Sequence, residues 1–319
     1  MAAIGIDVGG TSVRAGVVDA SGGLLDTART ATARGEAALE EAIAGVVGEL
    51  RTRHDVEAVG LAVAGFVGDD RRTVMFAPHL PWRDADVADR IADRVGLPVT
   101  LEHDANAATF AEHRFGAARG CRVGVFVALG TGIGAGLLLN GELFRGAHGV
   151  APELGHLCLV PGGRTCPCGK AGCWERYCSG TALAATAVEL LATRPGRSTV
   201  LAREDPDAVT GRRVAGAARD GDPIARMAMA ELARWLGEGL ALVADVYDPE
   251  IVVIGGGVSE SAPLFLDEAR EVYMRSVTGG KRRPLARIRT AQLGDEAAIV
   301  GAATLAAEGP SPTKGGALR

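Results

Sequence analysis

The sequence has no long apolar run and no excess of positive charge. None of its apolar stretches approaches the ~20 residues that cross a bilayer, and no basic-plus-apolar signal precedes the first predicted strand. The formal net charge is -5, whereas recognition of nucleic acid usually needs a basic face. We therefore expect a cytoplasmic protein that binds neither membranes nor nucleic acid.

Cysteines are also few, but three of the six are clustered. Cys166, Cys168 and Cys173 form a Cys-x-Cys-x4-Cys run, and His156 lies ten residues before it. In a cytosolic protein, clustered thiols bind metal more often than they form disulfides. Three thiolates and one imidazole make a closed tetrahedral set for Zn²⁺ with no open position for water, so we expect a structural zinc.

The remaining cysteines leave the fourth ligand open. Cys158 or Cys178 could replace His156 at the metal; otherwise these two, with Cys121, are expected to be packing residues. Glu153 precedes His156 by three residues and Glu175 follows the last cysteine of the run by two. The metal would fix both carboxylates in position, where they are suited to accept hydrogen bonds from sugar hydroxyls.

Apolar periodicity predicts an α/β fold with an internal duplication. The segment IDVGGTSVRAGVVD aligns with VALGTGIGAGLLLN about 120 residues later, so both halves begin with strand, glycine turn, strand. We expect two homologous lobes over 1–118 and 119–308, with the helix at 296–307 a candidate addition to the first, and a disordered tail over 309–319. Strands are predicted over 3–8, 13–18, 24–30, 56–63, 98–102, 123–129, 137–139, 249–254 and 286–290, and helices over 37–53, 84–95, 104–114, 181–191, 223–246, 263–274 and 296–307.

The two glycine turns, DVGGT at 7–11 and LGTGIG at 129–134, lie at matching places in the duplication. Consecutive backbone N–H groups in such turns can surround phosphate oxygens, because only glycine lets the backbone come so close. Each turn alone could be a plain tight hairpin. Together, and with a third glycine cluster at 255–257, they favour a nucleotide bound between the lobes.

Two aspartates are candidates for phosphoryl-transfer chemistry. Asp7 would repel a phosphate unless a cation lay between them, so we expect it to hold Mg²⁺, through water. Thr11 and Thr131 can add hydroxyl donors to the turns. Asp104 lies at a strand end and a helix start, where it could be a simple N-cap or a base kept ionised by the helix N-terminus, and one residue can serve as both. Such a base accepts the hydroxyl proton of a nucleophile that needs positioning more than strong activation.

Six segments in order resemble the ROK family of bacterial sugar kinases, most closely its members that phosphorylate glucose. They are DVGGT at 7–11, EHDANAA at 102–108, LGTGIG at 129–134, ELGH at 153–156, CPCGKAGCWE at 166–175 and IGGGV at 254–258. The resemblance covers the chain up to about residue 305. It implies the actin-like ATPase (ribonuclease H-like) fold with two lobes around a cleft, ATP and Mg²⁺ in that cleft, a structural zinc, and a homodimer or homotetramer.

The resemblance also implies roles for single residues. Asp104 resembles the base that deprotonates the 6-hydroxyl of glucose. Sugar contacts are implied for Gly65, His103, Asp104, Glu153, His156 and Glu175, and zinc ligands for His156, Cys166, Cys168 and Cys173. Nucleotide contacts are implied for Asp7, Gly9, Gly10, Thr11, Gly130, Thr131, Gly132, Gly256 and Gly257.

One departure from the family pattern leaves alternatives open. The family usually has Asn immediately before the catalytic Asp, and this chain has His103, whose neutral imidazole can still donate or accept a hydrogen bond. A kinase for N-acetylglucosamine, N-acetylmannosamine, mannose or fructose, a polyphosphate-dependent kinase, and a sugar-sensing regulator without turnover are the alternatives. The family's repressors carry a helix-turn-helix before the first phosphate turn; only six residues precede Asp7, so DNA binding is not expected.

Overall fold

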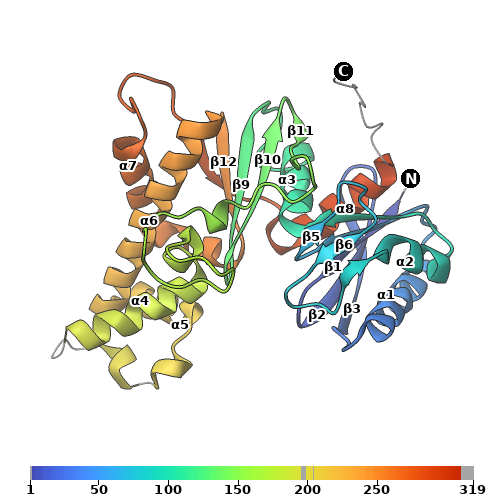
Figure 1. The fold of residues 1–319 in the computed structure, drawn as a ribbon, viewed down its shortest axis with the longest axis horizontal. Coiled ribbons are helices and arrows are strands. Elements are labelled where there is room, and N and C mark those ends of the chain that lie inside the picture. The colour runs from blue at the N-terminus through green and yellow to red at the C-terminus, as the bar shows by residue number, and fades with distance from the viewer. Residues whose placement is uncertain (1, 195–198, 204, 310–319) are drawn as a thin grey trace. The chain divides into compact units, whose positions relative to one another are not determined.

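The computed structural model describes residues 2–194, 199–203 and 205–309, and the chain divides into two compact units (Figure 1). The first unit contains the residues up to Gly120, Glu142–Pro152 and the residues from Gln292 on. The second contains Cys121–Gly141 and Glu153–Ala291. The first lobe was predicted to end at residue 118, whereas the first unit also contains two later segments, Glu142–Pro152 and the residues from Gln292 on. The second of these segments contains the helix at 296–307 that was a candidate addition. The predicted disordered tail lies, apart from Gly309, outside the described residues.

The first unit is built on a five-stranded sheet in the order β3-β2-β1-β4-β8. β1 pairs antiparallel with β2, and β4 and β8 run parallel to β1. The glycine turn at 9–11 closes the β1–β2 hairpin, because the apolar, β-branched runs on both sides of it favour strands. The strands are β1 Ala3–Val8, β2 Ser12–Val18, β3 Leu24–Ala31, β4 Val59–Val63 and β8 Val99–His103.

Helices cover both faces of this sheet. The even-numbered residues of β1, which are Ile4, Ile6 and Val8, form one core with the buried face of α1 and with α2. Figure 1 shows α1 and α2 on one side of the sheet and α8 on the other. The helices of the unit are α1 Glu36–Arg51, α2 Val87–Val95, α3 Asp104–Arg114 and α8 Ala297–Glu308.

A row of glycines lets α8 lie directly on the sheet. Gly16, Gly5 and Gly60 stand side by side on β2, β1 and β4. A Cβ at Gly5 would lie 1.8 Å from the carbonyl oxygen of Ile299, and one at Gly60 would lie 1.9 Å from that of Ala302. Helix and strand backbones are therefore in contact, which no residue with a side chain would allow.

Short elements complete the first unit. A three-stranded sheet in the order β5-β6-β7 was not predicted, and its strands are only two or three residues long. These are β5 Phe66–Val67, β6 Val74–Phe76 and β7 Arg83–Ala85, and β11 is Glu142–Leu143.

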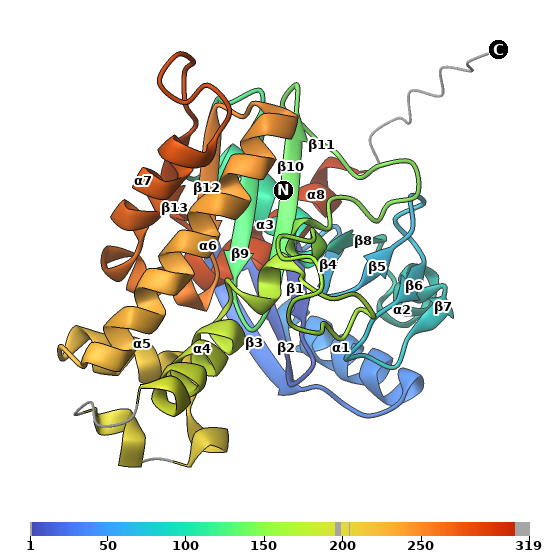
Figure 2. The same cartoon turned by 60° about the vertical axis from the view of Figure 1, so that its left-hand side comes forward.

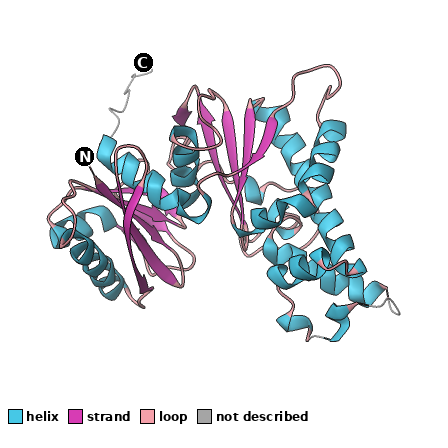
Figure 3. Cartoon of the chain, turned by 180° about the vertical axis from the view of Figure 1, so that it is seen from behind, coloured by secondary structure: helices cyan, strands magenta, loops and turns pink. Residues whose placement is uncertain are grey.

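The second unit repeats the strand pattern of the first. β9 and β10 form an antiparallel hairpin, and β12 runs parallel to β9, as β4 does to β1. The order is β10-β9-β12-β13, with helices packed beside the sheet (Figures 2 and 3). The elements are β9 Gly124–Leu129, β10 Ile133–Leu139, β12 Ile251–Gly255, β13 Arg287–Thr290, α4 Gly180–Thr193, α5 Gly211–Arg219, α6 Pro223–Tyr247 and α7 Leu266–Ser276.

Several parts of this prediction need correction. β10 begins at Ile133 and not at residue 137, because its alternating glycines hide the apolar pattern. The helix predicted over 263–274 is a 3-10 segment, Gly257–Leu264, followed by α7. α5 was not predicted.

Among the described residues, no helix combines the length and apolar character that crossing a membrane requires.

Candidate active site and metal centre

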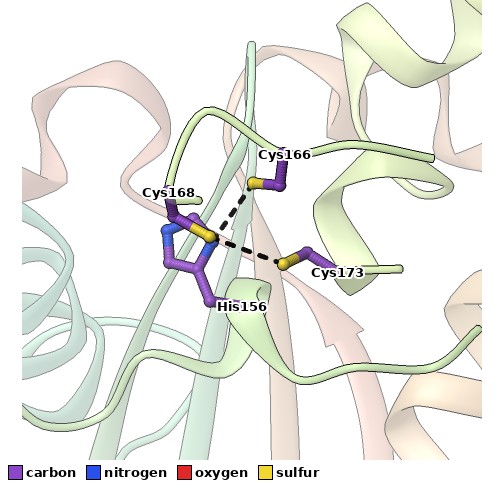
Figure 4. Close-up of side chains that lie close together, drawn as sticks. All are labelled: His156, Cys166, Cys168 and Cys173. Atoms are coloured by element: carbon purple, nitrogen blue, oxygen red, sulfur yellow. Dashed lines mark hydrogen bonds between the residues drawn. The ribbon is translucent and has the colours of Figure 1, made fainter. Parts of the chain in front are cut away.

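The predicted metal ligands come together in the second unit. One ligand atom from each of His156, Cys166, Cys168 and Cys173 lies within 4.8 Å of all the others (Figure 4). Sγ of Cys168 is 3.6 Å from Sγ of Cys173, and Sγ of Cys166 is 3.7 Å from Nδ1 of His156. Ligands about 2.0–2.3 Å from a tetrahedral Zn²⁺ are separated by about 3.5–3.8 Å. The donor set therefore fits a closed zinc site.

The other cysteines lie outside this group. Cys158 is exposed, and its thiol donates to the carbonyl oxygen of Ala171 at 3.4 Å. Cys178 is fully buried and faces the Leu232 carbonyl of α6 at 3.8 Å, and burial raises the pKa of its thiol. Among the described residues, the group of close ligand atoms contains His156 and neither of these two.

Trp174 anchors the cysteine loop to the core of the second unit. Its ring is fully buried, and its Nε1–H donates to the carbonyl oxygen of Trp235 on α6 at 2.8 Å. A Cβ on Gly239, one turn further along α6, would lie 2.0 Å from the Trp174 ring. Glycine in mid-helix costs helix stability, and here it makes room for the ring. The loop is thus fixed at a point directly after Cys173.

His156 stands between the metal ligands and two carboxylates. Its Nδ1 faces Cys166 and lies 3.7 Å from Oε1 of Glu175, while its Nε2 lies 3.8 Å from Oε2 of Glu153. Coordination through Nδ1 leaves Nε2–H to donate away from the metal. The two predicted sugar-binding glutamates and the metal centre therefore form one arrangement.

The predicted phosphate turn of the second unit lies beside the same loop. Oε2 of Glu175 is 3.4 Å from the backbone N–H of Ile133. Gly256 adopts φ 76°, and a Cβ there would lie 2.6 Å from the carbonyl oxygen of Leu129. Because β9 and β12 are adjacent parallel strands, Gly130 and Gly256 follow their carboxyl ends at the same edge of the sheet, where open α/β sheets bind ligands.

Gly180 belongs to this edge and was not predicted. Its backbone N–H donates to the carbonyl oxygen of Gly130 at 2.8 Å. Ser179 caps α4 by accepting from the N–H of Ala182, so the helix N-terminus lies at the phosphate turn. The signal in the sequence is Ser-Gly before a run of helix formers, a pattern that also marks ordinary caps.

Three predicted residues of the first unit also lie at one sheet edge. Asp7 is near the end of β1, Gly65 follows β4 and Asp104 follows β8, and these three strands are adjacent and parallel. A Cβ on Gly65 would lie 2.6 Å from the carbonyl oxygen of Phe76, so only glycine fits there. The carboxyl ends of these strands therefore bring a glycine and two carboxylates together.

Asp104 is the first residue of α3, and its neighbour His103 occupies the N-cap position. The reading of Asp104 as a simple N-cap is therefore wrong. Its Oδ1 accepts from the N–H of Ala105 at 2.7 Å and lies 3.2 Å from Nε2 of His103. The side chain is 37% exposed, which leaves the carboxylate accessible to a ligand.

Asp7 is paired across the β1–β2 hairpin. Nε and Nη2 of Arg14 lie 3.2 and 2.5 Å from its Oδ2. Burial nevertheless raises the pKa of Asp7, against the lowering effect of Arg14. In the turn that follows, Gly9 donates to Ser12 at 3.1 Å and its carbonyl accepts from the Thr32 hydroxyl. The exposed Gly10 and Thr11 leave the bend open to solvent.

A family profile described as ROK family matches residues 3–309. The chain is 45% identical over 312 residues to a glucokinase of Streptomyces coelicolor, covering 97% of this chain and 98% of that protein. Among solved structures it is similar to a ROK family glucokinase from Streptomyces griseus in complex with glucose and AMPPNP, with TM-score 0.87 and 44% identity, over 97% of this chain and 100% of that one. It is also similar to a ROK hexokinase from Thermus thermophilus, with TM-score 0.78 and 34% identity, over 97% and 98% of the two chains.

These matches extend over both units of the chain. The family and the fold expected from the six sequence segments are therefore confirmed. The duplicated arrangement of β1, β2 and β4 against β9, β10 and β12 is the internal repeat of that fold. The chain belongs to the ROK family and has its actin-like ATPase fold.

Proposed function

We propose that this protein transfers the γ-phosphoryl group of ATP to the 6-hydroxyl of glucose. The observation that carries the proposal is the accessible carboxylate of Asp104, which lies after β8 at the sheet edge that also holds Gly65 and Asp7. The similarity to a glucokinase over nearly the whole chain, and to a structure that contains glucose and AMPPNP, supports the same reaction.

Asp104 acts as the base in this reaction. Its carboxylate accepts the proton of the 6-hydroxyl as the hydroxyl oxygen bonds to the γ-phosphorus. The bond from that phosphorus to the bridging oxygen breaks, and ADP leaves with its electron pair. Asp104 is the first residue of α3, so its carboxylate lies at the positive end of the helix dipole. His103 takes the place next to the base, where its imidazole can bind a sugar hydroxyl.

The glycine turns bind the phosphates of ATP in this proposal. The backbone N–H groups that would bind phosphate oxygens are those of Gly9, Gly10 and Thr11 in the first unit and those of Gly130, Thr131 and Gly132 in the second. Gly256 and Gly257 would contact the adenosine. Gly256 has a left-handed backbone conformation, and a Cβ there would collide with Leu129, so both observations require glycine at this position.

Asp7 fits a water-mediated contact to Mg²⁺. Arg14 pairs with its Oδ2 and the side chain is only partly exposed, which favours a contact to the ion through water. Bound Mg²⁺ would neutralise charge on the phosphates. Asp7 would orient the hydrated ion at the end of β1.

The zinc proposed for His156, Cys166, Cys168 and Cys173 has a structural role. Bound zinc would fix His156, whose Nε2 faces Glu153, and would hold the loop that carries Glu175. These three side chains would then bind sugar hydroxyls. Four protein ligands would leave a bound zinc no open position for water, so it would supply no chemistry to the transfer.

A kinase for another hexose is the main alternative, because His103 replaces the usual Asn beside the base. A panel of glucose, mannose, fructose, N-acetylglucosamine and N-acetylmannosamine with ATP, followed by coupled detection of ADP, separates the two. Glucose should give the highest kcat/KM. Polyphosphate in place of ATP tests the other phosphoryl donor.

The homodimer or homotetramer and the cytoplasmic location expected from the sequence stay predictions.

Asp104→Asn tests the chemistry directly. Loss of the base should reduce kcat by about 10²–10⁴-fold while glucose still binds. Turnover by Asp104→Asn at the rate of the unmodified protein would show that another group is the base. The absence of turnover in the unmodified protein with every sugar would instead favour a sugar-sensing regulator.

A further inference from the structure

Glu102 is a buried carboxylate directly before His103 and Asp104. Its side chain is 4% exposed. Oε2 accepts from Nε of Arg145 at 2.9 Å and from Nη2 at 2.7 Å, and Nε of Arg71 lies 3.6 Å from the same oxygen. A buried charge needs such partners, and here two guanidinium groups surround one carboxylate.

The second oxygen of Glu102 holds the junction between β8 and α3. Oε1 accepts from the backbone N–H of His103 at 3.1 Å and from Nδ2 of Asn106 at 3.1 Å. Asn106 is 1% exposed and lies in the first turn of α3. One carboxylate therefore connects the residue before Asp104 with the residue two positions after it.

Arg145 comes from a distant segment that belongs to the same unit. It lies in Glu142–Pro152, which is part of the first unit although β9 and β10 precede it in the chain. The N–H of Ala151 donates to the carbonyl oxygen of Arg145, and a Cβ on Gly149 would lie 2.4 Å from the carbonyl oxygen of Val67. The segment is thus packed on the first unit, and it leads directly to Glu153.

Arg71 is held in an unusual conformation beside the same carboxylate. Its φ is 56°, which is uncommon for a residue with a side chain and persists only where the surroundings impose it. Its Nη2 is buried and has no hydrogen-bond partner among the residues that the structure describes. Glu102 is thus the nearby negative charge for Arg71 as well as for Arg145.

We propose that Glu102, held by Arg145, is a positioning residue for the phosphoryl transfer, because it fixes the β8–α3 junction on which Asp104 stands. The inference rests on the proposed role of Asp104 as the base. Among the described residues, the polar partners of the Asp104 carboxylate are its two neighbours, Ala105 and His103, so its position depends on the backbone that Glu102 holds. A displacement of about 1 Å at a reacting group can cost about 10²-fold in rate.

Glu102→Gln tests the proposal against a matched control, Glu40→Gln. Glu40 is also a buried glutamate with two arginines, since Arg90 and Arg94 lie 3.4 and 3.2 Å from its carboxylate, but it belongs to α1. We expect kcat to fall about 10- to 100-fold in Glu102→Gln with the KM for ATP within about twofold, and kcat to stay within about twofold in Glu40→Gln. Thermal unfolding of both variants shows how much stability each has lost. A kcat loss in Glu102→Gln no larger than in Glu40→Gln, measured below both unfolding transitions, overturns the proposal.

Arg145→Lys, with Arg94→Lys as its control, serves if Glu102→Gln does not fold. Lysine keeps the charge but cannot make both hydrogen bonds that Nε and Nη2 of Arg145 donate to Oε2, so kcat should fall in Arg145→Lys and not in Arg94→Lys. Unchanged kcat in Arg145→Lys contradicts the proposal.

Asp104→Asn distinguishes an error in the positioning role of Glu102 from an error in the assignment of Asp104 as the base. If it is inactive while Arg145→Lys or Glu102→Gln is fully active, only the positioning role is wrong; if it is fully active, the assignment of the base is wrong.

Discussion

Oε2 of Glu175 lies 2.5 Å from the point where a Cβ on Gly132 would stand. The predicted phosphate turn and the predicted sugar carboxylate of the second unit are thus in direct contact. A side chain at position 132 would collide with Glu175, and it would also keep a phosphate away from the backbone. Oε1 of the same side chain accepts from the Cys166 thiol at 3.0 Å. One glutamate therefore joins the turn to the metal ligands.

Gly132→Ala should displace Glu175 and weaken sugar binding. The added methyl group cannot occupy the position of a carboxylate oxygen, so the side chain must move away from the turn. We expect the KM for glucose to rise about 10-fold or more, which corresponds to about 1.4 kcal/mol of lost binding. Steady-state kinetics with glucose varied at saturating ATP measure the change.

Gly130→Ala is the comparison for that variant. A Cβ at Gly130 meets no atom within 4 Å, so this change leaves Glu175 in place. Its effect should fall on the KM for ATP and not on that for glucose. Equal changes in glucose KM in the two variants would contradict the role of Glu175.

Cys168→Ser should lose zinc and, with it, affinity for glucose. Removal of one thiolate opens the four-ligand set, and the loop that carries Glu175 then loses the metal that holds it. Elemental analysis should give less than one zinc per chain. The KM for glucose should rise about 10-fold or more, because mutating the residues that support a metal site typically costs about 10- to 100-fold in metal affinity or activity.

Cys158→Ser is the matched control for the metal. Cys158 lies near the same loop but is exposed and outside the group of ligands. Full zinc content is expected in this variant. Zinc retained by Cys168→Ser and lost by Cys158→Ser would reverse the ligand assignment.

Two helical glycines should respond to alanine with opposite signs. A Cβ on Gly301 of α8 would lie 1.8 Å from the carbonyl oxygen of Ala107 on α3, whereas one on Gly48 of α1 meets nothing within 4 Å. Gly301→Ala should lower the free energy of unfolding by about 1–3 kcal/mol through overpacking. Gly48→Ala should raise it by about 0.5–1 kcal/mol through helix propensity. Urea unfolding measures both, and a stabilised Gly301→Ala would show that α8 can move away from α3.

The sequence predicted the main strands and helices because they carry strong local signals. Hairpins β1–β2 and β9–β10 have apolar β-branched runs on both sides of a glycine turn, and α6 has an N-cap Asp222 before Pro223. The strands of the β5-β6-β7 sheet carry no such signal, since two or three residues cannot show a period. The end of α7 was well placed, and its start was not, because Pro263 lies in the preceding 3-10 segment.

The site was predictable where its residues lie in short motifs. Cys166, Cys168 and Cys173 are close in sequence, so their grouping needed no knowledge of the fold. The contact of Glu102 with Arg145 joins residues 43 positions apart and depends on the segment at 142–152 packing on the first unit. Gly180 likewise reaches Gly130 only through the tertiary fold. Such contacts have no local signature.

Asp7→Asn should change the pH dependence of stability in a direction fixed by the pKa of Asp7. Burial raises this pKa above the ordinary value of 3.8. A group whose folded pKa is raised binds its proton more tightly in the folded chain, so its contribution to stability is present at acid pH and is lost as the pH rises through the folded pKa. The free energy of unfolding of the unmodified protein, relative to Asp7→Asn, should therefore decrease as the pH rises above 3.8 and then stay constant.

Urea unfolding at a series of pH values, in EDTA so that no metal binds, measures this difference. Asp19→Asn is the control of opposite sign, because hydrogen bonds from Ser21 and Gly23 lower the pKa of Asp19. Its contribution is present above the unfolded pKa and is lost as the pH falls through the folded one. If the Asp7 difference instead increased with pH, as expected for Asp19, the ion pair with Arg14 would outweigh burial, and Asp7 would be held ionised without a cation.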